Sequence, residues 1–395
     1  MVATPRLRLR CCTVRICIAY DCLFPFTVGG HERYLRHLAE ELAGADHEVT
    51  YLTRRQWPQD RPPDLDGVRV VVVSREEPLY DSAGRRRSGE AVRFGFGVLR
   101  HLLAHRRRYD VVHLVAFPYF SVPATRLALA FAGVPVFVDW PEVWSRAYWR
   151  EYLGRNGAIG YAVQRLCAWL TPHAFVFSDL HARRLREEGM RGPATRLPGP
   201  LAGDLEAHPA PMPEAPLVLF VGRMIPEKRA SLVPAAIAAA REALPALRGL
   251  IIGDGPEHAR LLAAIAALRL DEVIEAPGFV EAAEVRHAFE RATCLLAPSS
   301  REGFGIVAIE AAAAATPSIV VRGPDNAMVE RVAEGVNGFV VDEAEPWALA
   351  VAILAAHAGG QALRDATAEW FAREAPRLTS RATMRAVEAC YREVA

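Results

Sequence analysis

The chain has 395 residues, 51% of them hydrophobic and 24% charged, with a formal net charge of +1. This length predicts two domains rather than one, and the composition is typical of a folded globular protein. No stretch of 18 uninterrupted apolar residues occurs, so no transmembrane helix is predicted. No nucleic-acid partner is expected.

The charge is divided unevenly along the chain. Residues 1–203 carry 29 arginines and 20 acidic residues, a net +9, and residues 204–395 carry 18 basic and 26 acidic residues, a net −8. The densest basic runs are Arg85–Arg87 and Arg106–Arg108. They form either a solvated face or a surface that attracts an anionic acceptor or an acidic membrane.

The seven cysteines include no CxxC pair, and no Cys/His set has the spacing of a zinc site. These cysteines are typical of small hydrophobic residues in a reducing compartment. The first 30 residues resemble a signal peptide only faintly, because Arg15 and Asp21 interrupt the apolar run, and we expect a short tail before a first strand. The expected location is the cytoplasm, with a peripheral position at the inner face of the membrane as a variant.

Strand-like and helix-like segments alternate through the first half. Strands are expected at 14–20, 48–53, 68–73, 110–116 and 135–140, and helices at 31–45, 91–107 and 122–132. This alternation is typical of a parallel sheet covered by helices, as in α/β proteins.

Residues 192–216 contain seven prolines, which is the composition of a linker. After it the alternation restarts. Strands are expected at 217–221, 248–253, 272–276, 293–298, 317–321 and 338–341, and helices at 230–243, 257–268, 282–291, 305–315, 325–334, 345–357 and near the end of the chain. The sequence therefore predicts two doubly wound α/β domains that face each other.

The segment GRMIPEKR (222–229) follows an expected strand and holds Lys228, the only lysine among 47 basic residues. One lysine placed at random would fall in these eight of 395 positions about 2% of the time, so arginine is not an adequate substitute here. Arg223 and Lys228 stand in a loop, where two cations can converge on a diphosphate. The alternative is an ordinary solvent-facing loop.

The segment REGFGIVAIE (301–310) also follows an expected strand. Glycines at a helix start let backbone N–H groups approach an anion. Glu302 and Glu310, on either side of these glycines, suit hydrogen bonds from sugar or ribose hydroxyls, although capping or surface roles are the alternative. GDGPE (253–257) and TVGG (27–30) have the same strand, turn and helix pattern, so Gly29 and Gly30 are candidates for substrate approach.

Taken together, these stretches resemble the retaining glycosyltransferases of family 4, which have the GT-B fold of two Rossmann-like domains. The similar segments are VGGHERYLRHLAEELAGADHEVTYLT, DVVHL, FVGRMIPEKR, IIGDGPE, APGFV, APSSREGFGIVAIEAAAAATPSIV and DNAMVERVAEGVNGFVV. The resemblance implies an acceptor-binding domain at 1–203 and a nucleotide-sugar-binding domain at 204–374. Residues from about 375 to 395 would cross back onto the first domain.

The resemblance also implies roles for single residues. Arg223 and Lys228 would neutralise the diphosphate of the donor, Glu302 would bind the donor sugar, and Glu310 would hold the ribose. Further donor contacts are expected from Gly29, Gly30, Gly222, Gly278, Val280, Gly303, Phe304, Gly305 and Ile306.

The expected donor is a nucleoside-diphosphate sugar, with UDP favoured and GDP or ADP as alternatives. No metal or other cofactor is expected, because two cations and a helix start would stabilise the leaving group. A hexosyl or pentosyl group would pass, with retention, to a hydroxyl of a lipid, glycan or natural product. A monomer or weak homodimer is expected.

One departure concerns Pro141, which stands where many relatives carry a histidine that contacts the donor sugar. On the acceptor side the candidates are Glu142, Trp144 and His113, although the aromatic stretch 140–149 and a strand histidine are also typical of core packing. Two alternatives stay open: a sugar-nucleotide isomerase or epimerase on the same fold, and a non-catalytic sugar-nucleotide-binding protein.

Overall fold

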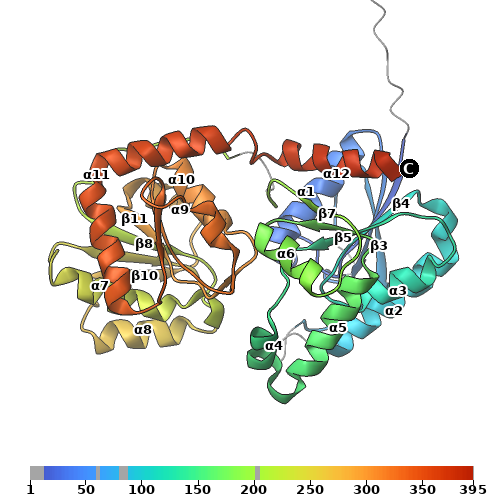
Figure 1. Cartoon of the computed structure of the whole chain (residues 1–395), viewed down its shortest axis with the longest axis horizontal. Coiled ribbons are helices and arrows are strands. Elements are labelled where there is room, and N and C mark those ends of the chain that lie inside the picture. The colour runs from blue at the N-terminus through green and yellow to red at the C-terminus, as the bar shows by residue number, and fades with distance from the viewer. Residues whose placement is uncertain (1–12, 59–62, 80–87, 201–204, 395) are drawn as a thin grey trace, which may run out of the picture.

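The computed structural model describes residues 13–58, 63–79, 88–200 and 205–394. It contains two α/β domains side by side, each built on a parallel sheet (Figure 1). The expected basic run Arg85–Arg87 and the expected domain boundary after residue 203 lie outside the described residues.

The first sheet has seven parallel strands in the order β3-β2-β1-β4-β5-β6-β7. From the centre, β1 pairs with β2 through Ile16 and Val49 and with β4 through Ile16 and Val111. The strands are β1 Arg15–Ala19, β2 Glu48–Arg54, β3 Val68–Ser74, β4 Val111–Val115, β5 Val136–Trp140, β6 His173–Val176 and β7 Ala194–Arg196. Central strands β4 and β5 are buried along their whole length, as expected of strands covered on both faces.

Helices cover both faces of the first sheet. The α-helices of this domain are α1 Gly30–Gly44, α2 Ser88–His105, α3 Ser121–Ala128, α4 Arg146–Leu153, α5 Gly157–Leu170 and α6 Asp179–Glu187. On one face, Leu35 and Leu38 of α1 join the core. On the other face, Phe94 of α2, Val122 of α3 and Cys167 of α5 join a separate core.

The second sheet has six parallel strands in the order β10-β9-β8-β11-β13-β15. The strands are β8 Leu217–Val221, β9 Arg248–Ile252, β10 Ile274–Gly278, β11 Cys294–Ala297, β13 Ser318–Val321 and β15 Gly338–Val341, and β12 Arg301–Glu302 pairs with β14 Asp325–Asn326. The helices are η3 Pro226–Lys228, η4 Ala230–Leu232, α7 Val233–Arg241, α8 His258–Ala267, α9 Ala282–Arg291, α10 Ile306–Ala313 and η5 Ala327–Arg331.

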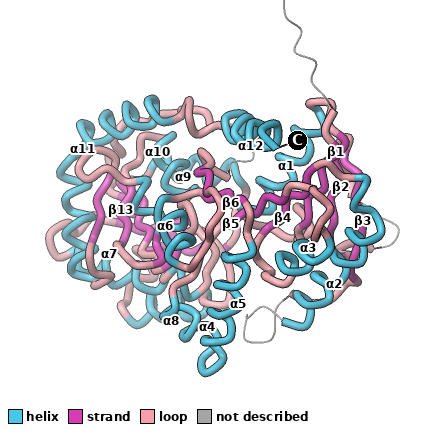
Figure 2. Tube along the Cα trace, turned by 45° about the vertical axis from the view of Figure 1, so that its right-hand side comes forward, coloured by secondary structure: helices cyan, strands magenta, loops and turns pink. Residues whose placement is uncertain are grey.

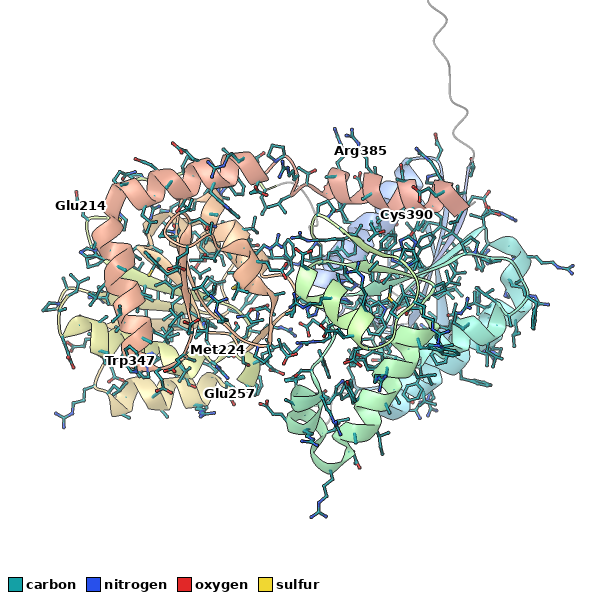
Figure 3. All side chains as sticks on the ribbon, in the orientation of Figure 1. Glu214, Met224, Glu257, Trp347, Arg385 and Cys390 are labelled. Atoms are coloured by element: carbon teal, nitrogen blue, oxygen red, sulfur yellow. The ribbon has the colours of Figure 1, made fainter. Side chains whose placement is uncertain are left out.

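The last two helices connect the domains. Helix α11 (Pro346–Glu374) is bent at Gly360, packs Leu349 and Ile353 in the second core, and brings Phe371 to the first. Helix α12 (Ser380–Val394) then runs along α1 (Figure 2). Its Cys390 is buried against the first domain, whereas Arg385 points outward (Figure 3). The expected crossing of the chain end is confirmed.

Helix α11 is also, within the described part of the chain, the one helix long and apolar enough to cross a membrane by length and composition. Its Leu349 and Ile353 lie in the core of the second domain. This is the arrangement of a long core helix.

The prediction from the sequence missed some elements and misassigned others. The expected linker at 192–216 contains the short edge strand β7, and the expected helix at 325–334 is β14 followed by the 3₁₀ helix η5. The Asn326 side chain accepts a hydrogen bond from the N–H of Met328, which favours a tight turn over an α-helix here. Helices α4, α5 and α6 and strand β6 were not predicted.

Candidate functional site

The loops after the parallel strands of the two domains meet across one interface. A Cβ atom at Gly30, where α1 begins, would lie 3.1 Å from the Cδ1 atom of Ile306, where α10 begins. A Cβ atom at Gly303 would lie 2.5 Å from the carbonyl oxygen of Pro141. The two domains are therefore in close contact at the expected site, and glycine is what permits this approach.

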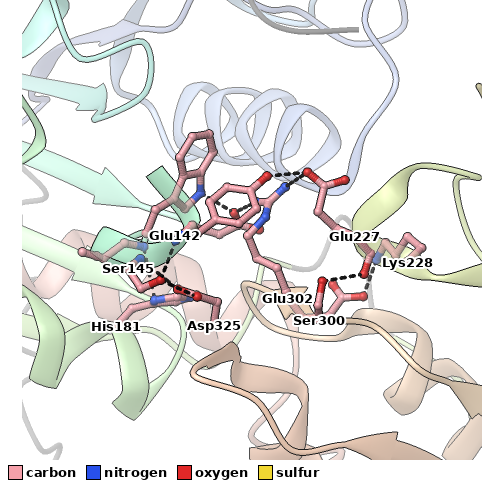
Figure 4. Close-up of polar contacts among 12 residues, drawn as sticks. Glu142, Ser145, His181, Glu227, Lys228, Ser300, Glu302 and Asp325 are labelled. Carbon is pink, nitrogen blue, oxygen red and sulfur yellow. Dashed lines mark hydrogen bonds and ion pairs between the residues drawn. The ribbon is translucent and has the colours of Figure 1, made fainter. Parts of the chain in front are cut away.

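Lys228 and Glu302 form an ion pair in this region (Figure 4). Lys228 ends η3, which follows β8, and Glu302 lies in β12, which follows β11. Ser299 Oγ donates a second hydrogen bond to Glu302 Oε1 at 3.1 Å. The side chains of Lys228 and Glu302 are 20% and 12% exposed, so the pair is largely shielded from water but still accessible.

The neighbouring residues form a second pair beside the first. Arg301 Nη2 lies 3.1 Å from Glu227 Oε1. The backbone N–H of Ser300 also donates to the carbonyl oxygen of Glu227 at 2.8 Å. Two consecutive residues of η3 thus pair with the two residues of β12, which fixes the two loops relative to each other.

Arg301 also extends into the first domain. Its guanidinium pairs with Glu142 and lies over the rings of Trp144 and Tyr148, at 5.1 and 4.7 Å from their centroids. Burial lowers the pKa of Arg301 to about 10, which leaves it protonated at neutral pH. Sequence reasoning missed Arg301, and its position beside Glu302 was the only available signal.

Glu142 and Trp144 are both occupied by this interdomain contact. Trp144 Nε1 donates to Glu142 Oε2 at 2.8 Å, and Trp144 is 9% exposed among other aromatic side chains. From the same stretch, the Tyr148 hydroxyl donates to Glu227 of the second domain. The aromatic stretch is therefore a packing and docking segment.

A second set of contacts joins the domains through acidic side chains. Asp325 accepts hydrogen bonds from Ser145 N at 2.9 Å and Ser145 Oγ at 2.7 Å, and it pairs with Arg184. Glu330 accepts from the N–H groups of Asp179 and Leu180 at the start of α6, where a negative charge is favourable. Asp325 and Glu330 of the second domain thus also join the two domains.

Arg223 is exposed and lines a cavity of about 580 Å³ between the domains. The first domain contributes the rest of the wall from the ends of β1, β2 and β3, with Phe26, Thr27, Gln56 and Glu76 among the lining residues. The cavity therefore offers an aromatic ring, a hydroxyl, an amide and a carboxylate to a ligand, with a second-domain cation at its edge.

Three loops of the second domain pack backbone to backbone. The N–H of Gly222 donates to the Ile252 carbonyl oxygen at 3.0 Å, and the N–H of Gly253 donates to that of Gly278 at 2.8 Å. Gly253 has φ +137°, and a Cβ atom there would lie 1.9 Å from the Gly222 carbonyl oxygen. Val280 packs against the core of this domain just beyond. The candidate residues after β8 and β10 are joined through Gly253.

Helix α10 begins with a tight turn and carries a half-buried carboxyl group, Glu310, one turn further on. Gly305 has φ +87°, and a Cβ atom there would lie 2.6 Å from Met328 Cγ. The Phe304 side chain is buried under the Arg331 guanidinium, so only its backbone is available to a ligand. Burial raises the pKa of Glu310, and Arg33 of α1 acts in the opposite direction.

The acceptor-side assignment of His113 does not fit the structure. Its side chain has no exposure, and it lies between Asp139, at 2.8 Å, and the Tyr391 hydroxyl of α12, at 2.6 Å. It belongs to the core beneath α12. Glu142 and Trp144 likewise lie in the interdomain contact and do not line the cavity. Within the described ranges no cluster of three or more His, Cys, Asp or Glu side chains could hold a metal ion.

Comparison with known proteins adds two family matches. Residues 206–369 match the model "Glycosyl transferases group 1", and residues 29–200 match "Glycosyl transferase 4-like domain". Between them the two models span most of both domains.

Curated relatives and solved structures are similar over most of the chain. A glycogen synthase of Mycobacterium tuberculosis is 26% identical over 75% of each chain. A D-inositol 3-phosphate glycosyltransferase of Thermobispora bispora is 29% identical over 82% of this chain and 81% of its own.

Among solved structures, sucrose-phosphate synthase from Thermosynechococcus elongatus superposes with a TM-score of 0.76 at 20% identity, covering 96% of this chain and 99% of its own. Anabaena HepE in complex with UDP superposes with a TM-score of 0.72 at 16% identity, covering 96% and 100%. These two likenesses establish the GT-B fold.

Proposed function

The chain belongs to the group 1 glycosyltransferases with a family 4-like first domain, and from this premise we propose that it moves a sugar from a nucleoside-diphosphate sugar to an acceptor hydroxyl with retention of configuration. The observation that carries the proposal is the pairing of the single lysine, Lys228, with Glu302 at the interface of the two domains. Sugar transfer is the common activity named for its relatives, which act on different acceptors.

The proposed chemistry needs positive charge where the diphosphate leaves. Lys228 supplies a compact ammonium and Arg223 a planar fork, and both follow β8. Negative charge that develops on the leaving diphosphate is stabilised most by groups that are already in place. The pairing with Glu302 and the η3–β12 contacts hold Lys228 in such a fixed position. This arrangement supports a reaction that runs without a metal ion.

The carboxylates have a different proposed role. Glu302 would accept hydrogen bonds from hydroxyls of the donor sugar, and Glu310 from those of the ribose. The glycine turns at Gly303 and Gly305 would let backbone N–H groups approach the phosphate or sugar. UDP is the favoured nucleotide of the donor, because Anabaena HepE, which shares the fold, was solved with UDP and with UDP-glucose.

The acceptor would enter through the cavity that Arg223 and the first domain share. Close packing at Gly303 and Pro141 would keep water away from the reacting carbon while the acceptor hydroxyl attacks. Pro141, which makes this direct contact, stands where many relatives carry a histidine. The Arg301–Glu142 pair would therefore help to shape the part of the site that holds the donor sugar without touching the sugar itself.

The test combines binding with turnover. Thermal unfolding of the purified chain is measured with UDP-, GDP-, ADP- and TDP-sugars, where the bound donor raises the midpoint. The stabilising donor is then incubated with glycan, inositol and lipid acceptors, with and without EDTA. Release of the nucleoside diphosphate together with a new glycosidic bond of unchanged anomeric configuration supports the proposal.

Three outcomes would contradict parts of it. Conversion of the nucleotide sugar without any acceptor indicates an isomerase or epimerase. Donor binding without turnover across the acceptors indicates a binding protein. Loss of turnover in EDTA that is restored by a divalent cation rules out metal independence.

A further inference from the structure

Three neighbouring helices of the first domain expose an unusual number of large apolar side chains. Half of the exposed large hydrophobic residues that the structure describes, 9 of 18, lie on or directly beside α2, α3 and α5. We call this set the apolar face: Val92, Phe96, Leu103, Phe120, Leu127, Phe131, Ile159, Leu166 and Trp169. Phe96 is 65% exposed, Leu127 is 66% exposed and Phe131 is fully exposed.

The core of the domain does not account for these residues. On α2, Phe94, Val98 and Leu102 already face the sheet, while Phe96 and Leu103 lie on the opposite side. Helix α5 has the same arrangement, with Cys167 inward and Trp169 outward. A surface helix normally carries polar residues on its outer side, and a large exposed apolar area marks an interaction site.

In Figure 1, helices α2, α3 and α5 lie next to one another at the lower right of the molecule. Helices α2 and α3 touch closely, since a Cβ atom at Gly95 would lie 2.8 Å from the Phe120 carbonyl oxygen. Helix α5 joins them through Tyr119, just before α3, whose hydroxyl donates to Gln164 Oε1 at 3.0 Å. The three helices that carry the apolar face therefore pack against one another along one side of the domain.

The charges around the apolar face are almost all positive. Residues 88–131, from the start of α2, contain two acidic residues: Glu90, which is 2% exposed, and Asp110, which Arg15 neutralises at 2.7 Å. Residues 157–170 of α5 contain none. The exposed cations on these helices and their flanking turns are Arg93, Arg100, Arg107, Arg108, Arg126, Arg155 and Arg165, of which Arg93 pairs with Glu77 and Arg165 lies 3.8 Å from Glu188. Negative groups on a partner would match this surface.

We propose that the apolar face docks on a lipid bilayer that contains anionic headgroups. Aromatic and leucine side chains enter the boundary between headgroups and acyl chains, while the arginines pair with lipid phosphates. A second copy of the chain fits less well, because the same arginines would then face each other. Docking goes beyond sugar transfer and does not depend on it.

The position of the apolar face relative to the cavity gives docking a consequence. Arg93 of α2 pairs with Glu77, which lines the cavity. The part of α2 around Arg93, including its neighbour Val92, thus lies beside the cavity wall. A bilayer held at this surface would present lipid-borne hydroxyls close to the cavity.

The test is co-sedimentation of the full chain with phosphatidylcholine vesicles that either contain or lack phosphatidylglycerol. The variant Phe96→Ser/Phe131→Ser/Trp169→Ser is compared with Leu262→Ser/Trp347→Ser/Val351→Ser, three exposed apolar residues of the second domain. We expect the first variant to bind the anionic vesicles weaker by roughly two orders of magnitude. The second should bind as the unchanged chain does, and thermal unfolding checks that both variants are folded.

A charge variant separates the two contributions. Arg100→Gln/Arg107→Gln/Arg126→Gln should weaken binding to the anionic vesicles by roughly fivefold per arginine, more at low salt than at high salt. Three results would overturn the proposal: no binding of the unchanged chain to anionic vesicles, equal binding by the two serine variants, or a dimer in light scattering that only the first serine variant dissociates. Each readout is independent of whether the chain transfers sugars.

Discussion

The Lys228 ammonium pairs with the Glu302 carboxylate, although 74 residues separate them along the chain. Each side chain comes from the loop after a different strand of the second sheet, and the adjacent pair of Glu227 with Arg301 keeps those loops in register. Glu302 therefore holds the ammonium at a fixed place, and the length of the cation matters. A guanidinium is larger and planar, so we expect it to replace the ammonium poorly at this position.

The first prediction follows from this fit. Replacing Lys228 with Arg keeps the charge but should lower kcat/KM for the donor by about tenfold or more, and Lys228→Met should lower it by about 10²–10³. Steady-state kinetics with the donor identified by thermal shift measures both. Arg248→Lys, at the start of β9 and 51% exposed, is the matched control and should change nothing. Unchanged kinetics for Lys228→Arg would show that shape is unimportant here.

The second prediction concerns Arg301 as the link between domains. Arg301→Met leaves Glu142 and Glu227 without their cation, so the domains should separate more easily and the radius of gyration in X-ray scattering should rise. A double-mutant cycle with Glu142→Gln should give a coupling of about 1–3 kcal/mol. Arg322→Met, in a surface pair with Asp342, is the control and should have little effect. An unchanged scattering profile would mean that Arg301 does not control closure.

The third prediction uses the close backbone approach between the domains at Gly303. Gly303→Ala would place a Cβ atom 2.5 Å from the Pro141 carbonyl oxygen and 2.9 Å from Glu142 Cγ, so the domains would be pushed apart. We expect lower kcat/KM together with faster hydrolysis of the donor by water relative to transfer. Gly44→Ala has no atom within 4 Å of the new carbon and should leave activity intact, with stability unchanged or about 0.5–1 kcal/mol higher. Equal transfer by both variants would exclude a role for this contact.

Local sequence patterns were sufficient to locate some residues of the candidate site but not others. Strand ends followed by glycine turns identified the loops that carry Lys228 and Glu302, because parallel strands open at one edge. Arg301 escaped attention because its partners Glu142 and Glu227 lie 159 and 74 residues away, and only tertiary packing brings them together.

The missed helix α5 has a local physical explanation. Helix α5 is apolar on its inner and outer sides, as Cys167 and Trp169 show, and this obscures the 3.6-residue period on which helix prediction depends. His113 was misplaced for another reason. Its position in a strand gave no sign that Asp139 and Tyr391 enclose it, the latter from the far end of the chain.

The last prediction concerns the pH dependence of stability. His181 is 1% exposed and accepts a hydrogen bond at Nδ1 from the N–H of Val143, and burial, with Arg184 nearby, lowers its pKa from 6.5 to about 3. Between these values the unfolded chain binds a proton that the folded chain does not. The free energy of unfolding should therefore fall as the pH drops below 6.5, by about 1.4 kcal/mol per pH unit from this residue.

Urea unfolding at a series of pH values from about 7 to about 4.5, the upper part of the range between the two pKa values, measures how the free energy of unfolding changes with pH. His181→Asn keeps an acceptor for the N–H of Val143 but cannot be protonated. The free energy of unfolding of this variant should therefore change less steeply with pH, by the contribution of one proton. Some slope should persist, because burial also lowers the pKa of His31 and brings that of His101 to about 4. His287→Asn removes a histidine whose side chain is 67% exposed and should leave the slope unchanged. If the free energy of unfolding falls equally steeply with decreasing pH in His181→Asn and in His287→Asn, then His181 is not the buried neutral base that its surroundings imply.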